Sequence, residues 1–268
     1  MKKFAVIGNP IAHSKSPEIH SDFAKQFDID LQYTKELVAV DNFFHFAKDF
    51  FQYASGANVT VPFKEDALQF ADQLSEEAKL AGAVNTLSKK QGKIIGDNTD
   101  GTGLVRDIRD NHQQSFHNKR ILIIGAGGAA RGVILPIAKE KPDAIYLVNR
   151  SPEKAQKLVE QFCQYAPMTA LTFTELNQSF GIIINATSAS LSGESLPLSD
   201  RIFTPESFAY DMMYQAMPTA FMTFARKHHA TAVDGLGMLV EQAAKSFEIW
   251  HGVKPHTQSV IEKVRRQL

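Results

Sequence analysis

The strongest chemical signal in the sequence is a glycine-rich segment, Gly125-Ala126-Gly127-Gly128-Ala129-Ala130, which follows an apolar run and precedes a helical pattern. Turns of the G-x-G-x-x-G/A type bring backbone N–H groups close to a pyrophosphate at the N-terminus of a helix. The dipole of that helix favours the negative charge. The segment therefore predicts a dinucleotide site, with a purely structural turn as the alternative.

The residues after the next predicted strand indicate which dinucleotide binds. NAD-binding folds usually carry an acidic residue about 20 positions beyond the glycines, where it holds the ribose diol. This chain has Asn149-Arg150-Ser151 instead, with Lys154 one turn later. A guanidinium can bond a 2′-phosphate bidentately, and a serine adds a hydroxyl donor. We expect NADP, the alternative being that Arg150 is a solvated residue at the start of a helix.

A second polar group lies near the N-terminus, where Ser14 and Ser16 flank Lys15 just before a predicted helix. Their hydroxyls and the free N–H groups of the first helical turn could hold an anion such as a carboxylate. A simpler alternative for Ser16 is the role of helix N-cap.

A predicted strand over residues 57–63 leads to Lys64. If the strand stays regular, Asn58, Thr60 and Lys64 share a polar face, opposite Val59, Val61 and Phe63. A partly desolvated lysine there could transfer protons, and Asp100, in the polar loop of residues 97–101, could orient it. The alternatives are an exposed lysine that starts a helix and a carboxylate that caps one. Spacing alone does not bring the two side chains together.

Alternating strands and helices must position these residues. Strands are expected at residues 4–7, 57–63, 83–87 and 93–96, with a helix from Ser16, and a polar surface connection at residues 107–119. A second series of strands, separated by helix-length segments, predicts a parallel, Rossmann-like sheet from residues 120–124, 144–148, 181–185 and 208–212. A long helix over residues 238–251 ends at Gly252.

Composition excludes several classes of protein. Lys and Arg number 29 against 29 Asp and Glu, so no global field attracts nucleic acid or a membrane surface. The single cysteine, Cys163, cannot form an internal disulfide and has no zinc-binding neighbour. No segment approaches the roughly 18 apolar residues of a membrane span. We expect a cytoplasmic protein with small-molecule partners and no metal.

Taken together and in order, nine segments resemble the shikimate dehydrogenase family over essentially the whole chain. They are residues 8–17, 58–64, 82–86, 97–101, 125–130, 149–151, 185–188, 210–214 and 234–242. The resemblance implies an α/β fold with two domains. A substrate-binding domain of residues 1–100 would be completed by C-terminal helices at 236–268, and a Rossmann-like NADP-binding domain would span 101–235.

The resemblance also implies an activity, the reversible NADPH-dependent reduction of 3-dehydroshikimate to shikimate in aromatic amino acid (chorismate) biosynthesis, by a monomer or homodimer. Lys64 and Asp100 would be the catalytic pair, acting across a cleft between the domains. The substrate would be held by Ser14, Ser16, Thr60, Asn85, Asp100, Tyr214 and Gln242. The cofactor would be held by Gly125, Ala126, Gly127, Gly128, Ala129, Asn149, Arg150, Ser151, Lys154, Met212 and Gly235.

Two alternatives and two departures from the family pattern remain. A quinate/shikimate dehydrogenase that prefers NAD would share the lysine and aspartate, but Arg150 argues against it. A nucleotide-binding scaffold without turnover would not need Lys64, Asp100 and the serine site together. Ser21 stands where the family often has Asn, and Ala189-Ser190 replaces a more usual Ser/Ala-Gly, which restricts positive φ in that loop.

Overall fold

The computed structural model describes residues 1–189 and 196–268, so Ser190 of the second departure lies outside the described residues. The chain divides into two compact units, residues 1–103 with 240–267 and residues 104–239 with 268. Both boundaries fall inside helices, α5 (Asp100–Arg106) and α9 (Leu236–His251), a few residues from the expected positions at 100/101 and 235/236. The predicted α/β fold class is confirmed. Which unit serves which ligand stays a prediction.

The first unit is built on a mixed sheet. Within the described chain its strand order is β2-β1-β3-β5-β6-β4. The bounds are β1 Lys2–Gly8, β2 Leu31–Leu37, β3 Gly56–Val59, β4 Gln73–Leu74, β5 Thr86–Lys90 and β6 Lys93–Asp97. Strand β1 pairs in parallel with β2 and β3, whereas β5 is antiparallel to both β3 and β6.

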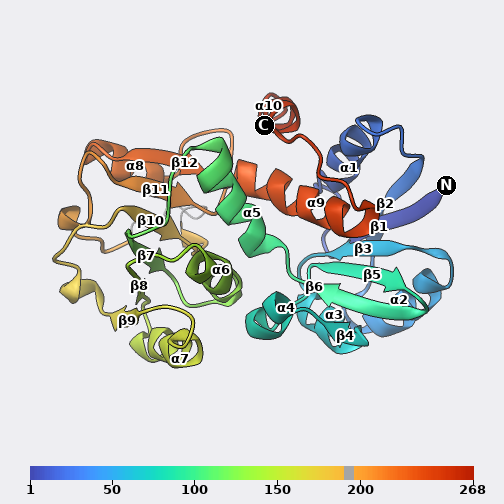
Figure 1. The fold of residues 1–268 in the computed structure, drawn as a ribbon, viewed down its shortest axis with the longest axis horizontal. Coiled ribbons are helices and arrows are strands. Elements are labelled where there is room, and N and C mark those ends of the chain that lie inside the picture. The colour runs from blue at the N-terminus through green and yellow to red at the C-terminus, as the bar shows by residue number, and fades with distance from the viewer. Residues whose placement is uncertain (190–195) are drawn as a thin grey trace. The chain divides into compact units, whose positions relative to one another are not determined.

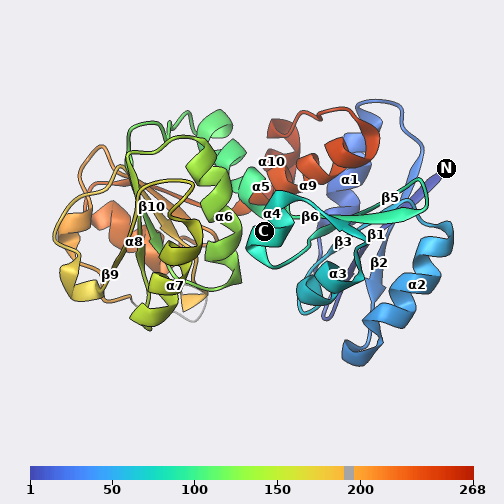
Figure 2. The same cartoon turned by 60° about the horizontal axis from the view of Figure 1, so that its bottom comes forward.

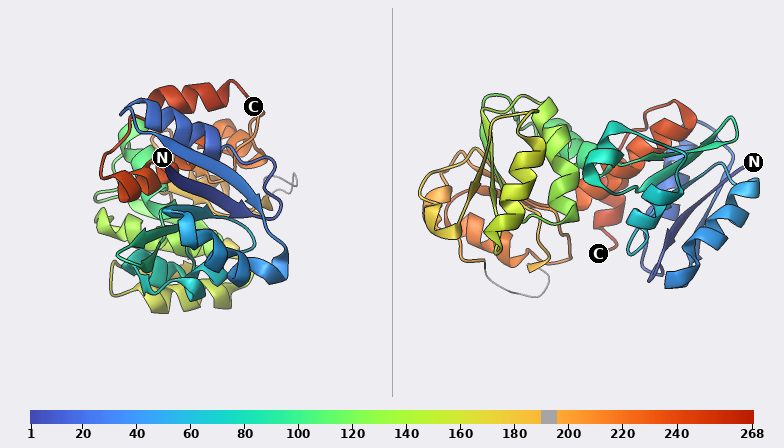
Figure 3. Two further views of the ribbon diagram at one scale, coloured as in Figure 1. Left: turned by 90° about the vertical axis from the view of Figure 1, so that its right-hand side faces the viewer. Right: turned by 90° about the horizontal axis from the view of Figure 1, so that it is seen from below.

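Helices cover both faces of this sheet. Successive side chains of β1 point to opposite faces, so they pack against both layers of helices. Phe4 points to one face, where its ring lies 4.7 Å from that of Trp250 in α9. Ala5 and Ile7 point to the other face and join a cluster with Phe43 and Phe63. Figures 2 and 3 show the helices in these layers. Their bounds are α1 Ser16–Lys25, α2 Phe43–Tyr53, α3 Lys64–Phe70, α4 Glu76–Ala81 and α10 Gln258–Arg265, with a 3-10 turn η1 at Val40–Asn42.

Strand β3 is shorter than the sequence predicted. It ends at Val59, and the chain then turns, with the N–H of Phe63 donating to the carbonyl of Thr60 at 3.0 Å. Val61 is 65% exposed, whereas Val59 and Phe63 are buried, so the expected alternation is wrong at Val61. The next residue, Pro62, has no N–H to continue a ladder.

The second unit carries a parallel sheet of Rossmann type (Figure 1). Its order over the described residues is β12-β11-β10-β7-β8-β9, so the first strand, β7, lies between β8 and β10. This is the strand order of dinucleotide-binding folds, whose ligands bind at the switch point beyond the carboxyl ends of the strands. The bounds are β7 Arg120–Ile124, β8 Ala144–Val148, β9 Met168–Leu171, β10 Ile182–Asn185, β11 Phe208–Asp211 and β12 Thr231–Asp234.

The crossover helices of this unit are α6 (Gly128–Lys139), α7 (Pro152–Phe162) and α8 (Ala220–Lys227), with 3-10 turns η3 at Phe173–Glu175 and η5 at Asp200–Ile202. The sequence did not predict β9 and β12, which have only 4 residues each and include exposed polar positions. No helix of the described chain is long and apolar enough to cross a membrane.

The predicted surface connection at residues 107–119 is wrong at its start. Residues Asp107–Asn111 form a helical turn, η2, and the Asp107 side chain is buried. One carboxylate oxygen accepts a hydrogen bond of 2.6 Å from the hydroxyl of Tyr210. Gly237 packs directly on this carboxylate, since a Cβ at that position would lie 2.0 Å from an oxygen of Asp107. Asp107 therefore belongs to the core.

Candidate active site

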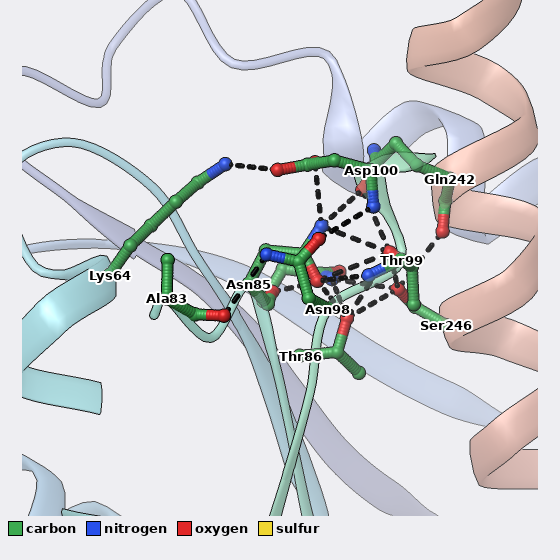
Figure 4. A network of polar contacts seen from close by, with 10 residues as sticks. Lys64, Ala83, Asn85, Thr86, Asn98, Thr99, Asp100, Gln242 and Ser246 are labelled. Carbon is green, nitrogen blue, oxygen red and sulfur yellow. Dashed lines mark hydrogen bonds and ion pairs between the residues drawn. The ribbon is translucent and has the colours of Figure 1, made fainter. Parts of the chain in front are cut away.

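Lys64 and Asp100 form a close ion pair in the first unit (Figure 4). Lys64 begins α3 and Asp100 begins α5, so each stands where a loop becomes a helix. Lys64 Nζ lies 2.6 Å from Asp100 Oδ2, and the side chains are 29% and 24% exposed. The ammonium group has three N–H donors, and the Asp100 carboxylate accepts a hydrogen bond from one of them. The pair is fixed by the protein and still reachable by a ligand.

Asn85 supports the other oxygen of the Asp100 carboxylate. The backbone N–H of Thr99 donates to Asn85 Oδ1 at 2.9 Å, and an N–H can only donate. The amide nitrogen of Asn85 therefore faces away from Thr99 N and donates to Asp100 Oδ1 at 2.7 Å. Gln242 Oε1, on α9, lies 3.4 Å from the same nitrogen. The structure thus brings four of the predicted site residues together.

Ser14 and Ser16 lie at the start of α1. The Ser14 hydroxyl donates to Ser16 Oγ at 3.2 Å, and Ser14 Oγ also accepts from the backbone N–H of Ser16 at 3.3 Å. Helix α1 begins at Ser16, and Lys15 occupies the N-cap position without a side-chain cap. The N-cap alternative for Ser16 is therefore wrong, and its hydroxyl accepts the hydrogen bond from Ser14 instead.

Thr60 lies in the loop after β3, which is tied to the loop after β1. The N–H of Thr60 donates to the carbonyl of Ile7 at 2.9 Å, and the N–H of Asn9 donates to the carbonyl of Val61 at 3.0 Å. These bonds hold both loops at the same end of the sheet. Gly8 fits between them because a Cβ there would lie 2.5 Å from Thr60 Cγ2.

Tyr214 belongs to the second unit, in the loop after β11. Burial raises the pKa of its phenol above the usual 10, and the Asp234 carboxylate raises it further. Tyr214 is therefore a neutral hydroxyl at physiological pH, able to donate one hydrogen bond.

The predicted glycine loop lies between β7 and α6. Gly125 has φ +113, a conformation that favours glycine. A Cβ on Gly127 or Gly128 would meet no atom within 4 Å. Helix α6 starts at Gly128 without a side-chain cap. The loop thus leaves open space beside the N-terminus of α6, where the first N–H groups of a helix lack partners within the helix, as a phosphate site requires.

A cavity of about 340 Å³ adjoins this loop at the carboxyl ends of β7, β8 and β10. Its lining residues are Ile124, Gly125, Asn149, Arg150, Phe173, Thr187, Ser188, Ala189, Leu196 and Pro197. Asn149 Nδ2 donates to the carbonyl of Ser151 at 3.0 Å, which also accepts from the N–H of Lys154 at 3.0 Å. The cavity is lined by the exposed Arg150 and by polar side chains such as Asn149 and Thr187, so its residues fit an anionic dinucleotide.

Thr187, Ser188 and Phe173 were not predicted as site residues. The segment Asn185-Ala186-Thr187-Ser188 at the end of β10 was the available signal. Asn185 Oδ1 accepts from the N–H and the hydroxyl of Thr187, at 3.1 and 2.7 Å. Its amide nitrogen donates to buried Asp211 at 3.2 Å. Strand β11 thereby holds the Thr187 loop in place.

Met212 and Gly235 lie side by side after β11 and β12. A Cβ on Gly235 would lie 2.3 Å from the carbonyl oxygen of Met212, so only glycine fits this approach. The N–H of Gly235 donates to the carbonyl of Met213 at 3.1 Å. The structure thus brings together two further residues that the family resemblance implies at the cofactor.

Comparison with known families gives matches along most of the chain. Residues 6–87 match the shikimate dehydrogenase substrate binding domain. Residues 107–192 match shikimate / quinate 5-dehydrogenase, and residues 235–265 match the shikimate 5′-dehydrogenase C-terminal domain.

Individual proteins give the same result. The shikimate dehydrogenase (NADP(+)) of Herminiimonas arsenicoxydans is 52% identical over 267 residues, which cover 99% of this chain and 98% of that protein. The Ael1 enzyme of Pseudomonas putida has a similar crystal structure, with a TM-score of 0.95, 40% identity and 98% of each chain covered. Shikimate 5-dehydrogenase of Thermus thermophilus, crystallised with NADP(H) and shikimate, has a TM-score of 0.90, 30% identity and 100% coverage of both chains.

Proposed function

The chain belongs to the shikimate dehydrogenase family, and from this premise we propose that it reduces 3-dehydroshikimate reversibly to shikimate with NADPH, a step of aromatic amino acid biosynthesis. Relatives about half identical over their full length carry that name and the NADP(+) designation. The observation that carries the proposal is the Lys64–Asp100 pair with Asn85 behind it. A scaffold protein without turnover would have no use for this partly exposed pair.

The substrate is a ring with a carboxylate, a ketone and hydroxyl groups, and each has a matching group in the chain. Ser14 and Ser16, at the start of α1, suit the carboxylate, because hydroxyls and the N–H groups of the first helical turn all donate. Asp100 accepts hydrogen bonds from ring hydroxyls, and Asn85 and Gln242 extend this polar surface. Thr60 and Tyr214 add neutral hydroxyls in the same proposal.

Reduction of the ketone adds a hydride to carbon and a proton to oxygen. NADPH, when bound, supplies the hydride. Lys64 supplies the proton in this proposal, since its ammonium can donate to the ketone oxygen as negative charge develops there. Asp100 keeps the ammonium oriented and accepts a hydrogen bond from a neighbouring ring hydroxyl. The neutral lysine then regains a proton from solvent.

The second unit would hold the cofactor. Gly125, Ala126, Gly127, Gly128 and Ala129 present backbone N–H groups to the pyrophosphate, at the N-terminus of α6. Arg150 lines the cavity with Asn149, and Ser151 and Lys154 follow in the same turn. A guanidinium there matches a 2′-phosphate, which supports NADP over NAD. Met212 and Gly235 would border the nicotinamide end.

The proposed enzyme works in the cytoplasm on small molecules. The lone Cys163 supports a reducing compartment, because it offers no partner for a stabilising disulfide.

The decisive experiment measures the absorbance of the reduced nicotinamide with shikimate or quinate, each with NADP or NAD. The proposal predicts the highest kcat/KM for shikimate with NADP. A preference for NAD with comparable rates on quinate would establish the quinate/shikimate dehydrogenase alternative instead. Absence of turnover in all four combinations would contradict both.

A further inference from the structure

A buried set of hydrogen bonds lies behind the predicted substrate residues of the first unit. It begins at His20 and Tyr33 and leads to Asn85, whose amide holds the Asp100 partner of Lys64. The joining residues are Tyr33 in β2, Asn58 in β3 and Thr86 in β5.

Asn58 is the centre of this set, and its orientation follows from its partners. It is 6% exposed and lies opposite Thr86 in the β3–β5 ladder. Its amide nitrogen lies 3.2 Å from the carbonyl oxygen of Asn85, which can only accept, so this end of the amide is the NH2 group. The same nitrogen donates to Thr86 Oγ1 at 3.2 Å and to Ser246 Oγ at 3.0 Å. The oxygen Oδ1 must therefore face the other way.

Two donors meet that oxygen. The Tyr33 hydroxyl donates to Asn58 Oδ1 at 2.7 Å. His20 Nε2 lies 3.1 Å from it, and since Oδ1 only accepts, Nε2 must carry the proton. Burial lowers the pKa of His20 to about 3, so the ring is neutral, and its other nitrogen, Nδ1, has no partner in the described chain.

The Asn85 amide beside the Lys64–Asp100 pair is held through the same residue, Asn58. Thr86 Oγ1 accepts from Asn58 and lies 2.9 Å from Asn85 Oδ1. It also lies 2.7 Å from Ser246 Oγ on α9. Together with the Thr99 N–H, this hydroxyl keeps the oxygen of the Asn85 amide turned inward, and the NH2 group turned toward Asp100 (Figure 4).

We propose that Tyr33, Asn58 and Thr86 are positioning residues. Their hydrogen bonds form a frame that holds the Asn85 amide, and through it the Asp100 carboxylate, in a fixed orientation toward Lys64. None of the three need touch the substrate. The proposal rests on the proposed function and deepens it, since the frame sets where the Lys64–Asp100 pair meets the substrate. Reaction rates depend on such spacing because a misplacement of about 1 Å at the reacting atoms can reduce the rate a hundredfold.

Two substitutions that keep the shape of the side chain test the far and the near part of the frame. Tyr33→Phe removes one of the two donors to Asn58 Oδ1, so kcat should fall about two- to threefold with KM for shikimate nearly unchanged. Thr86→Val removes the hydroxyl that holds Asn85, so kcat should fall about tenfold with a smaller change in KM. Thr86→Ser keeps the hydroxyl and should restore most of kcat.

Ser207→Ala is the matched control for the loss of a buried hydrogen bond. Ser207 is buried in the second unit and donates to the carbonyl of Phe180 at 2.7 Å. This variant should lower the melting temperature and leave kcat and KM unchanged. If Tyr33→Phe and Thr86→Val behave like it, the three residues only stabilise the fold, and the proposal is overturned.

A measurement without turnover separates this proposal from the proposed function. In ¹⁵N-labelled protein, the side-chain amide resonances of Asn85 should shift in Thr86→Val and stay in place in Ser207→Ala. Wild-type protein that fails to oxidise shikimate would overturn the proposed function, while the resonances still decide on the frame. Unmoved Asn85 resonances in Thr86→Val would refute the frame even if the enzyme is active.

Discussion

The two candidate ligand sites are built from different kinds of chemical group. In the first unit, charged and amide side chains hold one another, as Lys64, Asp100 and Asn85 do at 2.6 and 2.7 Å. In the second unit, the glycine loop leaves open space at the N-terminus of α6, and the exposed Arg150 lines the same cavity as Gly125. Residues in contact have coupled energies, whereas separate ones act additively. The first site should therefore fail as a whole and the second one contact at a time.

The largest expected effect comes from breaking the pair in the first unit. Lys64→Ala should lower kcat by about 10²–10⁴, because it removes the proposed proton donor, while shikimate still binds. Steady-state kinetics with calorimetric titration of shikimate measures both quantities. Lys48→Ala, at an exposed position of α2, is the control for loss of a lysine charge and should be silent. Near-normal turnover by Lys64→Ala would remove Lys64 from the mechanism.

The coupling in this pair can be tested by combining variants. Asp100→Asn keeps the size of the side chain and removes its charge, so kcat/KM should fall strongly with folding intact. If the two groups act as a unit, the double variant should lose little more than Lys64→Ala alone. Multiplicative losses would show two independent contributions, and the contrast between the units would weaken.

The second unit should respond to a single contact. Arg150→Ala removes a charge-assisted interaction worth about 1.5–3 kcal/mol, which corresponds to a roughly tenfold to hundredfold weaker Kd for NADP. NAD lacks the 2′-phosphate, so its Kd should hardly change. Fluorescence titration of both cofactors measures the difference, and added salt should weaken NADP binding more than NAD binding. Lys157→Ala, an exposed cation on α7, controls for net charge. Equal losses for both cofactors would mean that Arg150 supports the shape of the loop.

The same contrast explains which parts the sequence could predict. The glycine loop, Asn149 and Arg150 follow short apolar strands whose ends are visible as composition changes, and the parallel order of β7, β8 and β10 then brings them to one edge. Lys64 and Asp100 are 36 positions apart, and only the turn after Val59 and the start of α5 bring them together. Regular alternation failed at Val61 because the strand ends before it.

Buried hydrogen-bond partners were also beyond prediction. Tyr33, Thr86 and Ser246 come from two strands and a distant helix, and periodicity gives the face of such residues but not their neighbours. Asp107 was placed on the surface because its neighbours in the sequence are polar, although Tyr210 and Gly237 enclose it. The roles assigned to the site residues stay predictions until they are tested.

Lowering the pH should destabilise the first unit more than the second. Burial lowers the pKa of His20 to about 3 and that of His251 to about 4, both in the first unit. Below pH 6.5 these histidines bind protons in the unfolded chain but not in the folded unit. Their contribution to the free energy of unfolding is therefore fully present above pH 6.5 and is lost as the pH falls toward the folded pKa values. His20 alone should lower the free energy of unfolding by up to about 1.4 kcal/mol for each pH unit, which is about tenfold in the folding equilibrium constant.

Hydrogen exchange at pH 7 and pH 5 locates this effect. Protection of the slowest amides should fall in residues 1–103 more than in 104–239. His20→Gln keeps an N–H donor for Asn58 but does not titrate in this range, so its protection should depend less on pH. An unchanged slope in that variant would show that other groups control acid stability.

The smallest expected effect tests whether the serines of the first unit bind substrate at all. Ser14 and Ser16 lie at the start of α1, with one hydroxyl bonded to the other at 3.2 Å. If they hold the carboxylate equally in the ground state and the transition state, Ser14→Ala should raise KM for shikimate about three- to tenfold and leave kcat nearly unchanged. Ser16→Ala should act in the same direction, with some loss of stability because its buried hydroxyl also accepts the hydrogen bond from Ser14. Ser21→Ala, at an exposed serine of the same helix, supplies the control and should leave KM unaltered. Should Ser14→Ala and Ser16→Ala reduce thermal stability while KM stays constant, the serines would serve the fold alone, and the carboxylate would have to be bound elsewhere in the unit.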